Sequence, residues 1–111
     1  MKKLALLAIS MIFSVAVFAT EFTGTFKSDK NTITLHQDDA MINGVITLNG
    51  VEYKLNGKMK DGRAYVDIVS KGNELFSHAE LYFENGELKL SLADFKAAEA
   101  KGVAVRSTFV K

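Results

Sequence analysis

The chain offers few of the side-chain combinations that catalysis or metal binding requires. It contains no cysteine and only two histidines, His36 and His78. His36 is followed closely by Asp38 and Asp39, a grouping that could suggest a cation site. One imidazole and two carboxylates on a tight turn supply too few ligands, and aspartate is favoured in turns for its own hydrogen-bonding reasons. We therefore expect a turn at this position, and neither a metal nor a cofactor in the protein.

The chain also has few residues suited to nucleophilic or acid catalysis. No serine after residue 19 lies in a Gly-x-Ser-x-Gly motif, and there is no thiol. The aspartates and glutamates fall almost entirely on a face that we expect to be solvated, where neither burial nor a like-charged neighbour would raise a carboxyl pKa. We expect that the protein is not an enzyme. The enzyme alternative would require a pocket with buried titratable groups.

One group of aromatic side chains suggests binding. In the strand pattern described below, Tyr65, Phe76, His78 and Tyr82 fall together on the outward face, with His78 opposite Tyr65. Such a patch can bind a partner protein or a sugar ring. The alternative is that these residues only stabilise the sheet by cross-strand pairing or contact a helix.

The inward face offers few polar groups to a ligand. Tyr53, Ser77 and Ser107 are the inward residues that could orient a small molecule inside the fold. Bulky inward side chains suggest that the interior is mostly filled, namely Phe22, Phe26, Phe83 and Phe109. A role exerted through the surface is therefore favoured, and a small-ligand-binding barrel is the alternative.

These residues are placed by short segments in which apolar and polar residues alternate, separated by turns rich in Asn, Asp and Gly. This pattern is typical of antiparallel strands joined by tight hairpins. The chain has no proline, which would interrupt the strands. The expected strands lie near 21–27, 32–37, 40–48, 51–59, 63–70, 74–84, 87–92 and 103–110.

Each turn fixes a register, and in every hairpin the register sets apolar residues against apolar or small ones. A short turn then also explains why Asn-Gly recurs along the chain, since Asn and Gly reach positive φ at low cost. The expected turns and pairs are Ser28 to Asn31 with Phe26 against Ile33, Asp38-Asp39 with Leu35 against Ile42, Asn49-Gly50 with Leu48 against Val51, Asp61-Gly62 with Met59 against Ala64, Lys71-Gly72 with Ile68 against Leu75, and Asn85-Gly86 with Phe83 against Leu88.

The pattern changes between Ala93 and Lys101, where strong helix formers predict a short helix that ends at Gly102. Phe95 and Ala98 share one face of it, so we expect the helix to cover an open end of the sheet. In a meander of eight strands the last runs antiparallel to the first and can pair with it. The sequence therefore predicts an all-β, eight-stranded antiparallel barrel with one short helix before the last strand, and a two-sheet sandwich is the alternative.

Several segments resemble a known group of proteins. Gly24-Thr25-Phe26, Leu35-His36-Gln37, Asn43-Gly44 and the stretch from Gly50 to Gly57 are similar to a pattern common in small exported bacterial β domains of calycin-like, up-and-down build. The resemblance implies the barrel fold and assigns no activity. The avidin and lipocalin branches match less well, because the chain has no tryptophan and its helix precedes the last strand.

Residues 1–19 have the pattern of a cleavable secretory signal peptide. Lys2 and Lys3 form a basic start, an apolar run of about 15 residues follows, and Val17 and Ala19 stand at the positions that a signal peptidase reads. The run is shorter than the roughly 20 residues that span a bilayer as a helix. We expect cleavage after Ala19, and an uncleaved anchor is the alternative.

The remaining chain, residues 20–111, reads as a single domain. Without Lys2 and Lys3, 12 of the 14 basic residues remain against 13 acidic ones, and both signs are scattered. No basic block would follow a phosphate backbone, so we expect no nucleic-acid partner. The sequence thus predicts a soluble periplasmic or secreted protein that binds an unknown protein or small ligand and meets a membrane only through its signal peptide before cleavage. An outer-membrane barrel is a further alternative, although most expected strands are shorter than the roughly 9 to 11 residues that such strands need.

Overall fold

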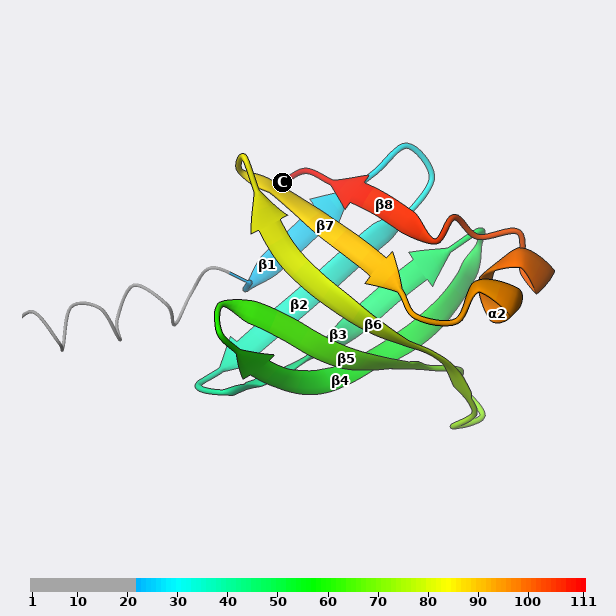
Figure 1. Ribbon diagram of the computed structural model, residues 1–111, viewed down its shortest axis with the longest axis horizontal. Helices are drawn as coiled ribbons and strands as arrows, with labels where there is room; N and C mark the ends of the chain where they lie inside the picture. Colours follow the sequence, from blue (N-terminus) through cyan, green and yellow to red (C-terminus); the bar gives the residue numbers. More distant parts are fainter. Residues whose placement is uncertain (1–21) are drawn as a thin grey trace, which may run out of the picture.

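The computed structural model describes residues 22–111, so the predicted signal peptide and its cleavage site lie outside the described residues. Eight antiparallel strands follow one another in sequence order, and a short helix separates the last two (Figure 1). The elements are β1 (Gly24–Lys27), β2 (Thr32–Asp38), β3 (Met41–Leu48), β4 (Val51–Lys60), β5 (Arg63–Val69), β6 (Leu75–Glu84), β7 (Glu87–Leu92), α2 (Phe95–Ala100) and β8 (Arg106–Phe109).

The sheet curls into a nearly closed barrel, which confirms the predicted fold and excludes the sandwich. Closure occurs where the end of β1 meets the residue after β8. Lys27 and Val110 exchange two backbone hydrogen bonds, of 2.7 and 2.8 Å. Figure 1 shows β1 and β8 approaching each other on the same side of the barrel. Joining the first and last strands leaves little free edge on the sheet.

Four of the six predicted hairpin registers are confirmed. The turns at Ser28 to Asn31, Asn49-Gly50, Asp61-Gly62 and Asn85-Gly86 set the expected residues against each other. The first residue of each two-residue turn has a positive φ, between 51° and 54°. Asn and Asp tolerate this conformation and Gly adopts it freely, which is why these dipeptides fix the register well.

The register predicted for Asp38-Asp39 is wrong. Asp38 is the last residue of β2 and pairs with Met41, so the turn consists of Asp39 and Ala40. Leu35 accordingly lies opposite Gly44 and not opposite Ile42. The shift is by two residues, so the same side chains still face inward.

The register predicted for Lys71-Gly72 is also wrong, and here the consequence is larger. Ser70 and Glu74 close a loop of three residues in which Asn73 has a φ of 65°. The register then shifts between Ile68 and Val69, and Ile68 pairs with Ser77.

This β-bulge reorients the start of β6. Ser77 keeps its predicted inward position, whereas Leu75, predicted to point inward, is 54% exposed. Phe76, predicted to point outward, is buried. An extra residue on one strand interrupts the alternation of faces, which explains both errors.

Two Asn-Gly pairs lie inside strands and not in turns. Gly44 is in β3 and Gly57 is in β4. A Cβ atom at Gly44 would lie 2.0 Å from the carbonyl oxygen of Thr34, and one at Gly57 would lie 2.1 Å from that of Tyr65. These glycines therefore allow neighbouring strands to approach closely. Part of the Asn-Gly recurrence, which the sequence suggested was due to turns, has this other cause.

Both ends of the barrel are covered. At the end away from α2, Phe22 and Phe26 pack against Phe83, with ring centroids 4.9 and 5.8 Å apart. At the other end, Ala98 of α2 is fully buried against the core. Phe95, which we expected on the same face as Ala98, is 67% exposed, so the covering role rests on Ala98 and not on Phe95.

The helix lies within the predicted segment 93–101 but is shorter, spanning Phe95–Ala100. The side chain of Asp94 caps it by accepting a hydrogen bond from the backbone N–H of Ala97, and Gly102 follows it with a φ of 68°. A hydrogen bond from Asn49 to the carbonyl of Lys101 ties its end to the turn between β3 and β4. Within residues 22–111, no helix is long and apolar enough to cross a membrane.

Candidate functional site

The outward side chains of β5 and β6 form the candidate site. Because the two strands are antiparallel neighbours, alternate residues of each lie side by side on the outside of the barrel. This surface, called the β5–β6 face below, consists of Arg63, Tyr65, Asp67, His78, Glu80 and Tyr82.

Arg63 connects Glu80 and Tyr82 in one half of this face. It donates a hydrogen bond to Glu80 in an ion pair, and its guanidinium carbon lies 4.5 Å from the ring centroid of Tyr82. The contact between Arg63 and Glu80 was predicted, although the two residues are diagonal and not directly opposite. The hydrogen bond to Glu80 raises the pKa of Arg63 above its ordinary value, so the guanidinium stays charged.

His78 lies in the other half of the face. Its Nδ1 atom is 2.6 Å from a carboxylate oxygen of Asp67, the residue directly opposite it across the strands. The expected position opposite Tyr65 is wrong because of the β6 bulge. Both side chains are more than half exposed. With Nδ1 engaged by Asp67, Nε2 is the imidazole nitrogen left for other contacts.

Tyr65 lies between two shallow hollows and is 46% exposed. One hollow, of about 610 Å³, is shared with Lys58, Lys60 and Asp61. The other, of about 320 Å³, lies toward β7 and is shared with His78. The ring therefore stands between two depressions that a partner's side chains could enter.

The predicted patch of four residues is only partly assembled. Tyr65, His78 and Tyr82 lie on the β5–β6 face as expected. Phe76 does not, because the bulge turns it inward, where its ring stacks on Tyr53 with centroids 4.9 Å apart and an interplanar angle of 25°. Phe76 is therefore a core residue.

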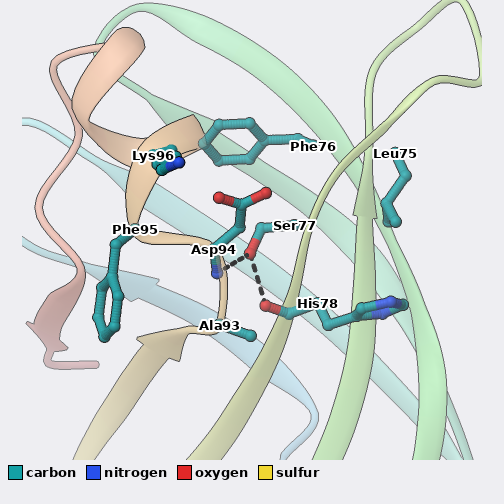
Figure 2. Close-up of a pocket in the computed structure, with 8 residues that line it drawn as sticks. All are labelled: Leu75, Phe76, Ser77, His78, Ala93, Asp94, Phe95 and Lys96. Atoms are coloured by element: carbon teal, nitrogen blue, oxygen red, sulfur yellow. Dashed lines mark hydrogen bonds between the residues drawn. The ribbon is translucent and has the colours of Figure 1, made fainter.

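The three predicted interior contacts do not form one site. Tyr53 is buried in its stack with Phe76. The hydroxyl of Ser77 donates to the carbonyl of His78 and accepts from the backbone N–H of Asp94, at 2.7 and 3.1 Å, which holds the start of α2 to β6 (Figure 2). Ser107 is half-buried and lines a different, outer hollow that also contains Tyr82.

A fourth hollow, of about 460 Å³, lies between α2 and the start of β6. Figure 2 shows Phe95 on one side of it, Leu75 and His78 on the other, and Ala93 between them. The sequence pattern gave no sign of this hollow. The helix was expected to turn Phe95 inward, and the β6 alternation was expected to bury Leu75, so neither residue was a candidate.

The remaining chemistry-bearing residues are dispersed. His36 lies on the outside of β2 opposite Asn43, with Asp39 in the turn beyond the strand. Among residues 22–111, no group of three or more His, Asp or Glu side chains is placed to hold a metal ion.

The fold and the site together define an antiparallel, up-and-down β-barrel that carries an aromatic and charged surface on its outside. No family model, curated protein or solved structure matches the chain. The function must therefore be argued from the site itself.

Proposed function

We propose that this chain is an exported, non-enzymatic binding protein that recognises a partner protein in the bacterial envelope through the β5–β6 face. The observation that carries the proposal is the arrangement of Arg63, Tyr65 and His78 on one face of the barrel, where Tyr65 and His78 also line hollows. Arg and aromatic side chains dominate the binding energy of many protein interfaces. The export step rests on the signal-peptide pattern of residues 1–19.

Pre-ordering of the face supports this role. Arg63 is held by Glu80 and by the ring of Tyr82, and His78 is held by Asp67. Side chains that are already fixed lose less conformational entropy when a partner binds. The face also carries both charge signs, which suits a protein surface better than a polyanion.

The alternatives have less support. A ligand inside the barrel would need polar partners, whereas the hydroxyl of Ser77 is already occupied and Tyr53 stacks on Phe76. An outer-membrane barrel would turn its apolar side chains outward, whereas here the outward face is charged and the inward face is apolar. An enzyme would need a pocket with buried titratable groups, and the carboxylate and imidazole of the β5–β6 face are exposed.

Affinity capture from envelope extracts tests the proposal. Purified residues 20–111, immobilised through the C-terminus, are compared with a Tyr65→Ala, His78→Ala double variant. We expect the double variant to lose at least tenfold of the specifically captured partner, because loss of two central interface residues costs that much or more.

A matched control keeps this result interpretable. Thr34 is exposed on the outside of β2, away from the β5–β6 face, so Thr34→Ala should capture the partner as the wild type does. Circular dichroism should show that all three proteins are folded alike. Equal capture by the double variant and the wild type would show that the β5–β6 face is not the binding surface.

A further inference from the structure

The hollow between α2 and β6 combines a projecting ring with a depression beside it. Phe95 is 67% exposed and Leu75 is 54% exposed, and both line the hollow together with Ala93 and buried Phe76 (Figure 2). Two large apolar side chains that face solvent next to an apolar depression are typical of an interaction surface.

The exposure of Phe95 is not required by the fold. Phe95 is the first residue of α2, directly after the cap Asp94, and the helix already reaches the core through Ala98. A smaller or polar residue at this position would serve the helix equally well. The packing of the barrel therefore gives no reason for a ring at this position.

The charges beside Phe95 indicate what covers it. Asp94 and Lys96 flank Phe95 in the sequence, both line the hollow, and no ion pair joins either of them to another described residue. In a pair of chains related by a two-fold axis, the same patch on each copy meets itself. A two-fold axis through the hollow can place Asp94 of each copy beside Lys96 of the other copy, which gives two equivalent ion pairs. In the same arrangement, the Phe95 ring of each copy enters the hollow of the other.

We propose that a second copy of this chain binds at this hollow, forming a symmetric dimer by reciprocal insertion of Phe95. The patch is complementary to itself in shape, because it carries both a projecting ring and a depression of about 460 Å³ that exceeds one ring in volume. It is also complementary to itself in charge, because it carries one charge of each sign. The dimer contact adjoins the β5–β6 face, shares His78 with it and leaves Tyr65 outside, and it does not depend on the proposed function.

Sedimentation equilibrium of residues 20–111 over a wide range of concentration tests the proposal. The wild type should pass from the mass of one chain to that of two, and Phe95→Glu should raise the dissociation constant at least tenfold. Met41→Glu is the matched control, because Met41 is a large apolar residue that is 52% exposed at the end of the barrel away from α2. It should dimerise as the wild type does. A wild type that stays monomeric at every concentration, or a Phe95→Glu variant that dimerises normally, would overturn the proposal.

The charge arrangement is tested separately. Lys96→Glu sets like charges against each other and should weaken the dimer, while an acidic residue in the first turn of α2 is compatible with the helix. Adding Asp94→Asn removes the repulsion and keeps a capping side chain, so the double variant should recover part of the affinity. No change in affinity with Lys96→Glu would contradict the proposed pairing of Asp94 with Lys96. Tyr65→Ala should leave the dimer intact, which separates this surface from the β5–β6 face.

Discussion

At the scale of single residues, two glycines inside strands, Gly44 and Gly57, determine how closely the neighbouring strands pack. Gly57 in β4 lies so near β5 that a Cβ atom would meet the Tyr65 carbonyl oxygen at 2.1 Å and the Val66 Cα at 2.6 Å. We expect Gly57→Ala to lower the free energy of unfolding by about 1–3 kcal/mol, as overpacking of a close contact does. Urea denaturation of residues 20–111 measures this effect.

Gly72 is the control for this substitution. It lies in the loop before β6, and the nearest atom to its added Cβ is the Ser70 hydroxyl at 3.8 Å. Gly72→Ala should therefore leave the stability unchanged or raise it slightly. If Gly57→Ala proved as stable as Gly72→Ala, the close approach of β4 and β5 would be wrong.

At the scale of elements, the bulge at the start of β6 decides which neighbouring residue belongs to the core. Phe76 is buried and stacks on Tyr53, whereas Leu75 is exposed. Phe76→Ala should lower the free energy of unfolding by about 3–5 kcal/mol, and Leu75→Ala by no more than about 0.5 kcal/mol in the monomer. Denaturation at low protein concentration measures both. If Leu75→Ala cost more stability than Phe76→Ala, the bulge would be wrong and the two faces of β6 would alternate without interruption.

The helix α2 depends on its cap because it has only six residues. Asp94→Ala removes the acceptor for the Ala97 N–H and should cost about 1 kcal/mol, whereas Asp94→Asn keeps an acceptor and should cost much less. Hydrogen exchange at Ala97 and Ala98 measures the effect locally. Equal exchange rates in the two variants would contradict the capping role.

The elements also show where sequence reasoning succeeded. Turns with Asn or Asp followed by Gly were placed correctly, because the required positive φ leaves few other residues suitable. The two incorrect registers occurred at Asp38-Asp39 and Lys71-Gly72, where neighbouring residues offer several ways to close a turn of similar cost. A loop one residue longer, followed by a bulge, leaves no signal in a pattern of alternating hydrophobicity.

The candidate site, like the strand registers, was predictable only where the strands are regular. Tyr65 and Tyr82 keep their outward positions because the strands there are regular, and Phe76 was misplaced because it lies at the bulge. The hollow beside α2 was missed because its lining depends on how the helix packs on the barrel, which Leu75 and Phe95 reveal only once the tertiary structure is known. Sequence periodicity reports which face a residue is on and not what lies next to that face.

At the scale of the whole molecule, the barrel is packed with apolar side chains and covered at both ends, by Phe22 at one end and by α2 at the other. What distinguishes this barrel is therefore on its outside. The β5–β6 face offers ordered aromatic and charged groups, and the hollow beside α2 offers an adjoining apolar surface that shares His78 with it.

Site-specific photo-crosslinking in living cells tests the central claim, that the exported chain binds a partner protein through the β5–β6 face. A photoreactive amino acid replaces Tyr65 in one strain and Thr34, on the outside of β2, in another. We expect a covalent adduct with a second, different protein from position 65 and none from position 34. Adducts from position 34 alone, or from neither position, would contradict it.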